Sequence, residues 1–116
     1  MSSPELRPRL RFPHSGPEAF GPGKADLLGY IAATGSIRTA AAEMDMSYQR
    51  AWTLVRQMND LFRGPLVTAT RGGGSGGGAR LTPLGEEVLA HYRRMETACR
   101  DATAPEWRAL QALLRK

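Results

Sequence analysis

Ser47, Tyr48, Gln49 and Arg50 are four consecutive polar residues at the start of a stretch that keeps helical spacing of apolar side chains to residue 62. A Gln side chain can form two hydrogen bonds with adenine, and an Arg side chain can form two with guanine. Ser and Tyr hydroxyls can bond to phosphate. Because a recognition helix presents its N-terminal residues to base edges, residues 47–62 are predicted to bind DNA in this way. The alternative is that these polar residues only cap and solvate an exposed helix end.

A shorter helix is predicted just before this one, at residues 37–44, with Ser36 as its N-cap. Its inner face is rich in alanine, so a partner helix can approach it closely. A turn of two residues, Asp45 and Met46, separates the two helices. Two helices joined in this way form a helix-turn-helix, a motif typical of DNA-binding proteins.

The segment RGGGSGGGAR (71–80) lies between two short segments with strand character, at 66–70 and 79–81. A β-hairpin after a recognition helix is a wing, and Arg71 and Arg80 at its base suit contacts with phosphate. No acidic residue accompanies these two arginines, whereas the charges of the other segments nearly balance. The run also contains the G-x-G-x-x-G pattern of dinucleotide sites, but no parallel βαβ unit follows it, so such a site is not predicted.

Catalytic and metal-binding chemistry finds no support in the sequence. Cys99 and His91 could suggest a thiol nucleophile with its base, but their separation along a helix would be about 12 Å, beyond hydrogen-bond reach. One cysteine and two histidines are also too few for an ordinary structural zinc site. The phosphate-binding Walker pattern requires Ser or Thr after its Lys, whereas Lys24 is followed by Ala25. We therefore expect no catalytic residue, no metal and no cofactor.

The composition indicates one small basic domain. The chain has 116 residues, a net charge of +5 and an isoelectric point near 10.1. This length allows one domain with a core of its own, and nucleic acid is the first partner to consider for such a domain. No apolar run reaches the roughly 20 residues that cross a bilayer. Since the N-terminus also lacks the apolar region of a secretory signal, we expect a cytoplasmic protein that makes no contact with a membrane.

The remaining elements are predicted from periodicity and from the positions of Pro and Gly. Apolar residues alternate with arginines over 6–12, which is typical of a half-exposed edge strand. A Gly- and Pro-rich connection at 14–23 leads to a short amphipathic helix at 24–34. Thr82 is predicted to cap the next helix, and Pro105 is expected to open a last short helix.

We therefore expect a mainly α-helical fold with one small β-hairpin, that is, a winged helix-turn-helix followed by C-terminal dimerisation helices. The apolar surfaces of these last helices are too broad for one small domain to cover, and surfaces of this kind mark interfaces. The chain is expected to divide into an N-terminal strand and connection (1–20), a winged helix-turn-helix DNA-binding core (21–82) and C-terminal helices for dimerisation (83–116).

Four segments closely resemble the N-terminal DNA-binding domain of ModE-type molybdate-responsive regulators, which belongs with the LysR-type winged helix-turn-helix group. They are GSIRTAAAEMDMSYQRAW (35–52), MNDLF (58–62), PLV (65–67) and GGGSGGGARLTPLGEEVL (72–89). The resemblance extends over about residues 21–95. It implies a homodimeric bacterial transcription regulator, in which the helix after the wing forms the dimer interface together with N-terminal elements.

Roles for single residues follow from position and from this resemblance. Arg38 and Thr39 lie at the start of the first motif helix. Their position and the family resemblance both predict that they contact the DNA backbone. Tyr48 is expected either to contact phosphate or to pack beside Trp52. Full-length members of the family continue into domains that bind molybdate or tungstate, whereas this sequence ends at Lys116, as a single-domain version would. We therefore expect no oxyanion effector on this chain.

The sequence thus predicts a transcription regulator that binds double-stranded DNA at a pseudo-palindromic operator, as a homodimer, through a recognition helix at 47–62 and a wing at 71–80. The resemblance links such a regulator to molybdate or tungstate metabolism. The alternative is a winged-helix module that binds a protein partner without sequence-specific DNA binding. The residues expected to contact DNA are Arg38, Thr39, Ser47, Tyr48, Gln49, Arg50, Arg71 and Arg80.

Overall fold

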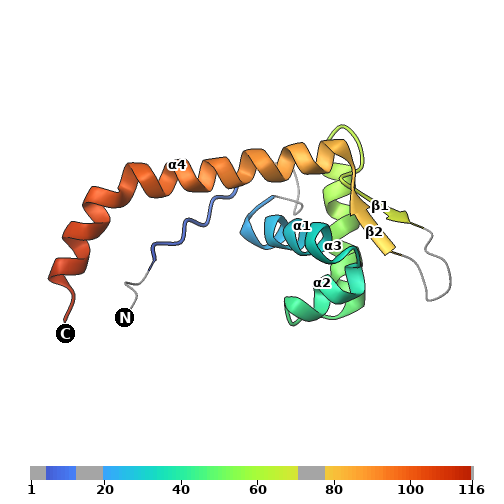
Figure 1. Ribbon diagram of the computed structural model, residues 1–116, viewed down its shortest axis with the longest axis horizontal. Coiled ribbons are helices and arrows are strands. Elements are labelled where there is room, and N and C mark those ends of the chain that lie inside the picture. Colours follow the sequence, from blue (N-terminus) through green and yellow to red (C-terminus); the bar gives the residue numbers. More distant parts are fainter. Residues whose placement is uncertain (1–4, 13–19, 71–77, 116) are drawn as a thin grey trace.

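The computed structural model describes residues 5–12, 20–70 and 78–115. Within these ranges three helices come first, a hairpin of two strands follows, and a long helix extends away from both (Figure 1). This order confirms the predicted mainly α-helical winged helix-turn-helix with a helical C-terminal part. The elements are α1 (Pro22–Thr34), α2 (Ile37–Glu43), α3 (Tyr48–Leu61), β1 (Val67–Thr70), β2 (Gly78–Leu81) and α4 (Pro83–Leu113).

Polar caps fix where the two motif helices begin. The Ser36 hydroxyl accepts a hydrogen bond from the backbone N–H of Thr39 at 3.0 Å, and the Ser47 hydroxyl accepts one from Arg50 at 3.0 Å. Such caps satisfy N–H groups that have no partner inside the helix. At the end of α1, Gly35 has a φ of 70°, a left-handed conformation that favours glycine. Both predicted caps are confirmed, and α1 begins two residues earlier than expected.

Helices α1, α2 and α3 share one hydrophobic core. Leu27, Leu28 and Ile31 of α1 are fully buried in the same cluster as Val55 and Met58 of α3. Burial of each such side chain contributes roughly 1.5–3 kcal/mol relative to exposure. The buried side of α2 is mostly alanine, so its backbone can lie close to its neighbours, as the sequence predicted. The core therefore determines which side of α3 faces solvent.

One side chain joins the hairpin to α3. The strands pair antiparallel, with Val67 opposite Leu81. The Asn59 carboxamide oxygen accepts hydrogen bonds from the N–H groups of Leu66 at 2.8 Å and Val67 at 3.1 Å, and its nitrogen donates to the Val67 carbonyl at 3.1 Å. The Asn59 side chain thus bonds to the start of β1 much as a neighbouring strand would. These bonds fix the hairpin relative to α3.

The first turn of α4 lies directly against the chain before β1. The Thr82 hydroxyl accepts from the Gly85 N–H at 2.9 Å and donates to the Pro65 carbonyl at 2.7 Å, so it caps α4 and anchors it at once. A Cβ atom at Gly85 would overlap the backbone carbonyl of Leu66. Glycine is therefore required here for the close approach of helix and loop.

The predicted edge strand at 6–12 is wrong. Residues 5–11 form no strand, and Phe12 makes an isolated bridge with Phe20, to whose carbonyl its N–H donates at 3.2 Å. A strand requires a continuous partner, and Pro8 has no N–H to give to one. The segment is instead anchored by side chains. The rings of Phe12 and Phe20 stack at 5.6 Å, and the Tyr92 hydroxyl donates to the Leu10 carbonyl at 2.6 Å.

The prediction of a separate last helix at Pro105 is also wrong, because α4 continues through Pro105 to Leu113 as one helix of 31 residues. Proline removes one backbone hydrogen bond from a helix interior and bends it, at a cost of about 3 kcal/mol. Good helix formers on both sides, mainly Ala, Arg, Glu, Leu and Gln, offset this cost. Figure 1 shows the axis of α4 turning in its last part, as expected for a proline bend. The expected C-terminal helices are therefore one bent helix.

Candidate nucleic-acid interface

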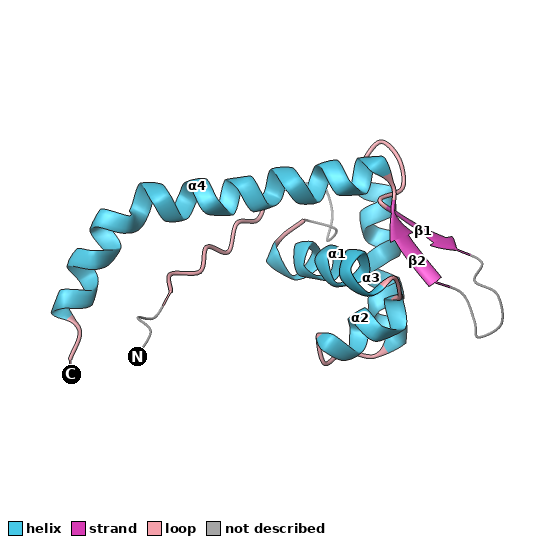
Figure 2. Ribbon diagram, viewed as in Figure 1, coloured by secondary structure: helices cyan, strands magenta, loops and turns pink. Residues whose placement is uncertain are grey.

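The exposed side of α3 is polar. Ala51 and Val55 are fully buried, and at 100° per residue Gln49, Thr53 and Arg56 lie on the opposite side. The Thr53 hydroxyl donates to the Gln49 carbonyl at 3.1 Å. Figure 2 shows α2 on the side of the domain away from α4, with the hairpin projecting next to α3. A polar helix face beside a projecting hairpin can enter the major groove of DNA.

A contact between Arg38 and Tyr48 joins the two motif helices at this surface. The guanidinium carbon of Arg38 lies 4.2 Å from the centre of the Tyr48 ring, a cation–π geometry. Tyr48 also packs against Trp52 in an edge-to-face arrangement, with the ring centres 6.3 Å apart. Tyr48 remains 40% exposed. It therefore packs beside Trp52 and still presents an edge to solvent, so the two expected placements do not exclude each other.

Ser47 and Thr39 lie in the first turns of the motif helices. The Ser47 hydroxyl accepts from the Arg50 N–H, so its bond within the structure is the cap of α3. Both residues are exposed. A capping hydroxyl keeps its own proton and can still donate it to a phosphate oxygen.

Arg80 lies on β2 opposite Thr68, and both residues are exposed. The buried neighbours of Arg80, Ala79 and Leu81, point to the other side of the strand, toward the core. The hairpin thus presents Arg80 outward near its base. Arg71 lies outside the described residues.

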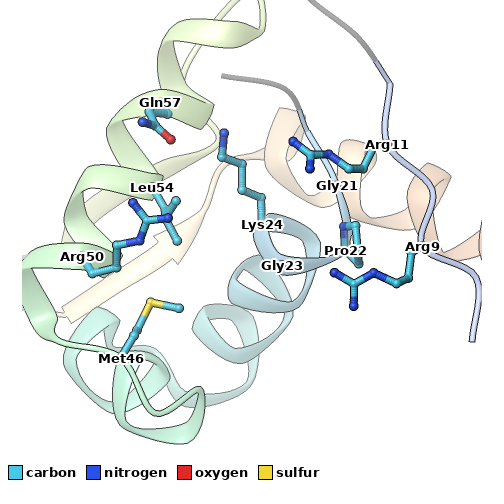
Figure 3. Close-up of a pocket in the computed structure, with 10 residues that line it drawn as sticks. All are labelled: Arg9, Arg11, Gly21, Pro22, Gly23, Lys24, Met46, Arg50, Leu54 and Gln57. Atoms are coloured by element: carbon cyan, nitrogen blue, oxygen red, sulfur yellow. The ribbon is translucent and has the colours of Figure 1, made fainter. Parts of the chain in front are cut away.

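Four basic side chains from three segments surround an open groove beside α3, which we call the basic groove (Figure 3). Its volume is about 520 Å³. In Figure 3 the side chains of Arg11 and Lys24 extend into the space between the start of α1 and α3, Arg50 borders that space from α3, and Arg9 lies beside Pro22. The lining residues are Arg9, Arg11, Gly21, Pro22, Gly23, Lys24, Met46, Arg50, Leu54 and Gln57.

The structure separates two neighbouring residues that the sequence predicted to read bases together, and it adds candidate residues that the sequence did not predict. Gln49 lies on the exposed side of α3, whereas Arg50 lies at its flank, in the basic groove. Arg56 was not predicted from the sequence, although its spacing of seven residues from Gln49 places both on one helix face. Arg9 and Arg11 of the groove were not predicted either, because no local sequence pattern shows that the N-terminal segment lies near α3.

Two other kinds of site are not found in the part of the chain that the structure describes. No group of three or more His, Cys, Asp or Glu side chains is arranged to hold a metal ion there. None of the described helices is both long and apolar enough to cross a membrane.

Known proteins match this domain over most of its described length. Residues 26–86 match the family described as bacterial regulatory helix-turn-helix protein, lysR family. The molybdenum-pterin-binding protein MopB of Rhodobacter capsulatus is 49% identical over 76 residues, which are 66% of this chain and 28% of MopB. The molybdenum transport protein ModE of Herbaspirillum seropedicae is 44% identical over 70 residues, 60% of this chain and 26% of that protein.

The DNA-binding transcriptional dual regulator ModE of Escherichia coli (strain K12) is 39% identical over 71 residues, 61% of this chain and 27% of the regulator. The chain thus spans between a quarter and a third of the length of these three relatives. The expected resemblance to ModE-type regulators is confirmed. Because the matched region covers more than half of the sequence and extends from within α1 to the start of α4, the chain belongs to the lysR family of bacterial regulatory helix-turn-helix proteins.

Proposed function

We propose that this chain is a sequence-specific DNA-binding transcription regulator. The observation that carries the proposal is the position of Gln49 and Arg56, which a capped helix start and a buried opposite face present to solvent beside the hairpin. Membership of a regulatory helix-turn-helix family supports it. One relative is named as a DNA-binding transcriptional regulator, which is consistent with the same activity here.

We assign a role to each candidate residue except Arg50, from its placement where the structure describes it and from the sequence for Arg71. Gln49 and Arg56 meet base edges in the major groove, where they can form bidentate bonds. The arginines of the wing base bind phosphate, which positions the protein without reading sequence. The residues assigned to the DNA backbone at the motif are Arg38, Thr39, Ser47 and Tyr48, and those of the wing are Arg71 and Arg80.

The regulator acts as a homodimer, in which the last part of α4 meets the same part of a second copy. Leu110 and Leu113 are 56% and 81% exposed, and Leu114 is exposed as well. Large apolar side chains grouped on one helix end are typical of an interface. A two-fold dimer requires a pseudo-palindromic operator whose half-sites are about one DNA turn, or a multiple of it, apart.

The setting of this activity is the bacterial cytoplasm, where regulators of this family meet their DNA, and the chain has no enzymatic role. A link to molybdenum metabolism is supported by the names of the relatives, a molybdenum transport protein and a molybdenum-pterin-binding protein among them.

Selection of bound fragments from genomic DNA with the purified protein tests the proposal. We expect enrichment of a palindromic motif, and we expect Gln49→Ala to weaken binding to it by about 1–3 kcal/mol per half-site and to relax its sequence preference. Arg63→Ala is the matched control, because Arg63 is exposed beyond the end of α3. If no DNA motif is enriched, and if the affinity of the protein for DNA does not fall with rising salt, the protein-interaction module is favoured instead.

A further inference from the structure

We propose that the basic groove binds a phosphate group, and that this phosphate belongs to the DNA backbone that flanks the bases read by α3. The proposal rests on the proposed function, because DNA brings the phosphate. It extends the DNA-binding surface to the N-terminal segment and to the first turn of α1, which no local motif identifies. It also moves Arg50 from base reading to phosphate binding.

The charge of the groove favours an anion. Its described lining residues include Arg9, Arg11, Lys24 and Arg50, and none of them is acidic. Guanidinium groups match the oxygens of phosphate with two parallel hydrogen bonds. Pro22 and Gly23, at the start of the 13-residue helix α1, line the same groove. The partial positive charge of a helix N-terminus adds to the attraction for an anion there.

The arginines of the N-terminal segment are held in place although the segment forms no strand. The Tyr92 hydroxyl donates to the carbonyl of Leu10, the residue between Arg9 and Arg11, at 2.6 Å. The side chain of Arg11 lies on the backbone of Gly21. A Cβ atom added at Gly21 would come within 2.8 Å of the Cγ atom of Arg11. Both arginines remain exposed. Anchored backbone with exposed cations is what binding of an external anion requires, because little ordering remains to be done on binding.

The groove is continuous with the candidate interface. Arg50 and Gln57 line it and belong to α3, one flank away from Gln49 and Arg56. A DNA strand that passes the exposed face of α3 therefore continues across the groove. This geometry favours a backbone phosphate over an anion that binds alone, and free phosphate becomes the second arm of the test.

The experiment compares Arg9→Gln and Arg11→Gln with Arg7→Gln. All three remove one positive charge from the same exposed segment, but Arg7 does not line the groove. On the selected operator with native flanks, we expect the groove variants to bind about fivefold more weakly at low salt. They should also lower the salt slope of affinity by about 1 for each phosphate interaction removed per protomer. Arg7→Gln should keep the slope of the parent.

The outcomes separate failure of this inference from failure of the proposed function. If the parent binds the operator and the groove variants match Arg7→Gln, the DNA phosphate is refuted and the function stands. If the parent binds no DNA, the proposed function fails. In the second arm, inorganic phosphate is titrated at constant ionic strength without DNA, with the melting temperature as readout. If phosphate stabilises the parent but not Arg11→Gln, the groove binds free phosphate. If neither the DNA arm nor the phosphate arm shows an effect of the groove variants, the proposed site is refuted.

Discussion

The two halves of α4 belong to one helix but have opposite surroundings. In the first half, Gly85 touches the chain before β1, and Tyr92 is 3% exposed, with its ring packed on Phe20 at 5.4 Å. Arg93 forms an ion pair with Asp26 of α1 at 2.9 Å. In the last part of the helix Leu110 and Leu113 are exposed, as is Leu114 just after its end. In the first half the domain therefore covers Tyr92 but leaves Met95 49% exposed, and it covers none of the three terminal leucines.

This difference shows what the domain cannot do by itself. A helix of 31 residues is about 46 Å long, which is longer than a three-helix domain of this size can cover. Helices in proteins gain most of their stability from packing an apolar face, and a segment without such packing is only marginally stable in water. The second half also contains Pro105, which weakens it further. We infer that its stability comes from a second copy of the chain, as the proposed dimer requires.

The largest expected effect is on assembly. Leu110→Glu combined with Leu113→Glu should raise the dimer dissociation constant about 100-fold or more, because burying each carboxylate in an apolar contact is costly. The unfolding free energy of the winged domain should change little, since both leucines are exposed within one chain. Sedimentation measures the first quantity and urea unfolding of the monomeric variant the second. An unchanged dimer would place the interface elsewhere.

Gly85→Ala should destabilise the covered half by about 2–3 kcal/mol, because the new methyl group meets the Leu66 backbone, which cannot move aside as a flexible side chain could. Gly23→Ala in α1 is the control, since no atom lies within 4 Å of the added Cβ and alanine favours a helix. Urea unfolding should show loss for the first and no loss for the second. Equal stability of the two variants would contradict the close approach of α4.

Local chemistry explains why the motif itself was predictable. The caps at Ser36, Ser47 and Thr82 act within three residues of themselves, so they can be identified without the fold. The helical spacing from Ala51 to Met58 likewise fixes which side of α3 is buried. The position of Gln49 on the other side follows directly. The fold class was therefore accessible from sequence.

Long-range contacts explain what was missed. The alternation at 6–12 predicted a strand, but a strand also depends on a partner elsewhere, and Phe12 finds only Phe20. Likewise, Arg11 and Arg50 line one groove because the N-terminal segment packs on Gly21 and on Tyr92 of α4, which no local pattern encodes. The penalty of Pro105 is local and is offset by the good helix formers on both sides, so the helix continues where the sequence predicted a break.

Tyr92→Phe should cost about 1 kcal/mol of unfolding free energy at neutral pH, because it removes the hydrogen bond to Leu10 and keeps the buried ring. Burial raises the pKa of Tyr92, and the nearby carboxylates of Glu96 and Asp26 raise it further. A group whose pKa is higher in the folded state loses its stabilising effect as the pH rises past its ordinary value of 10.0. The difference between parent and variant should therefore shrink above pH 10 in urea titrations. A difference that grows there would contradict the burial of a neutral hydroxyl.

The smallest expected effect comes from the ion pair between α1 and α4. The side chains of Arg93 and Asp26 are 40% and 47% exposed, so solvent screens their attraction, and we expect a coupling of about 0.5 kcal/mol. Arg93→Met alone should cost more than this, because Glu96, whose side chain is 12% exposed, also loses its partner at 2.9 Å. A double-mutant cycle with Asp26→Asn isolates the pair between helices. A coupling above 2 kcal/mol, or one that persists in 1 M salt, would mean that charge holds the first half of α4 on the domain. The small value expected here assigns that role to the buried ring of Tyr92 and the contact at Gly85, which are features that the second half of the helix lacks.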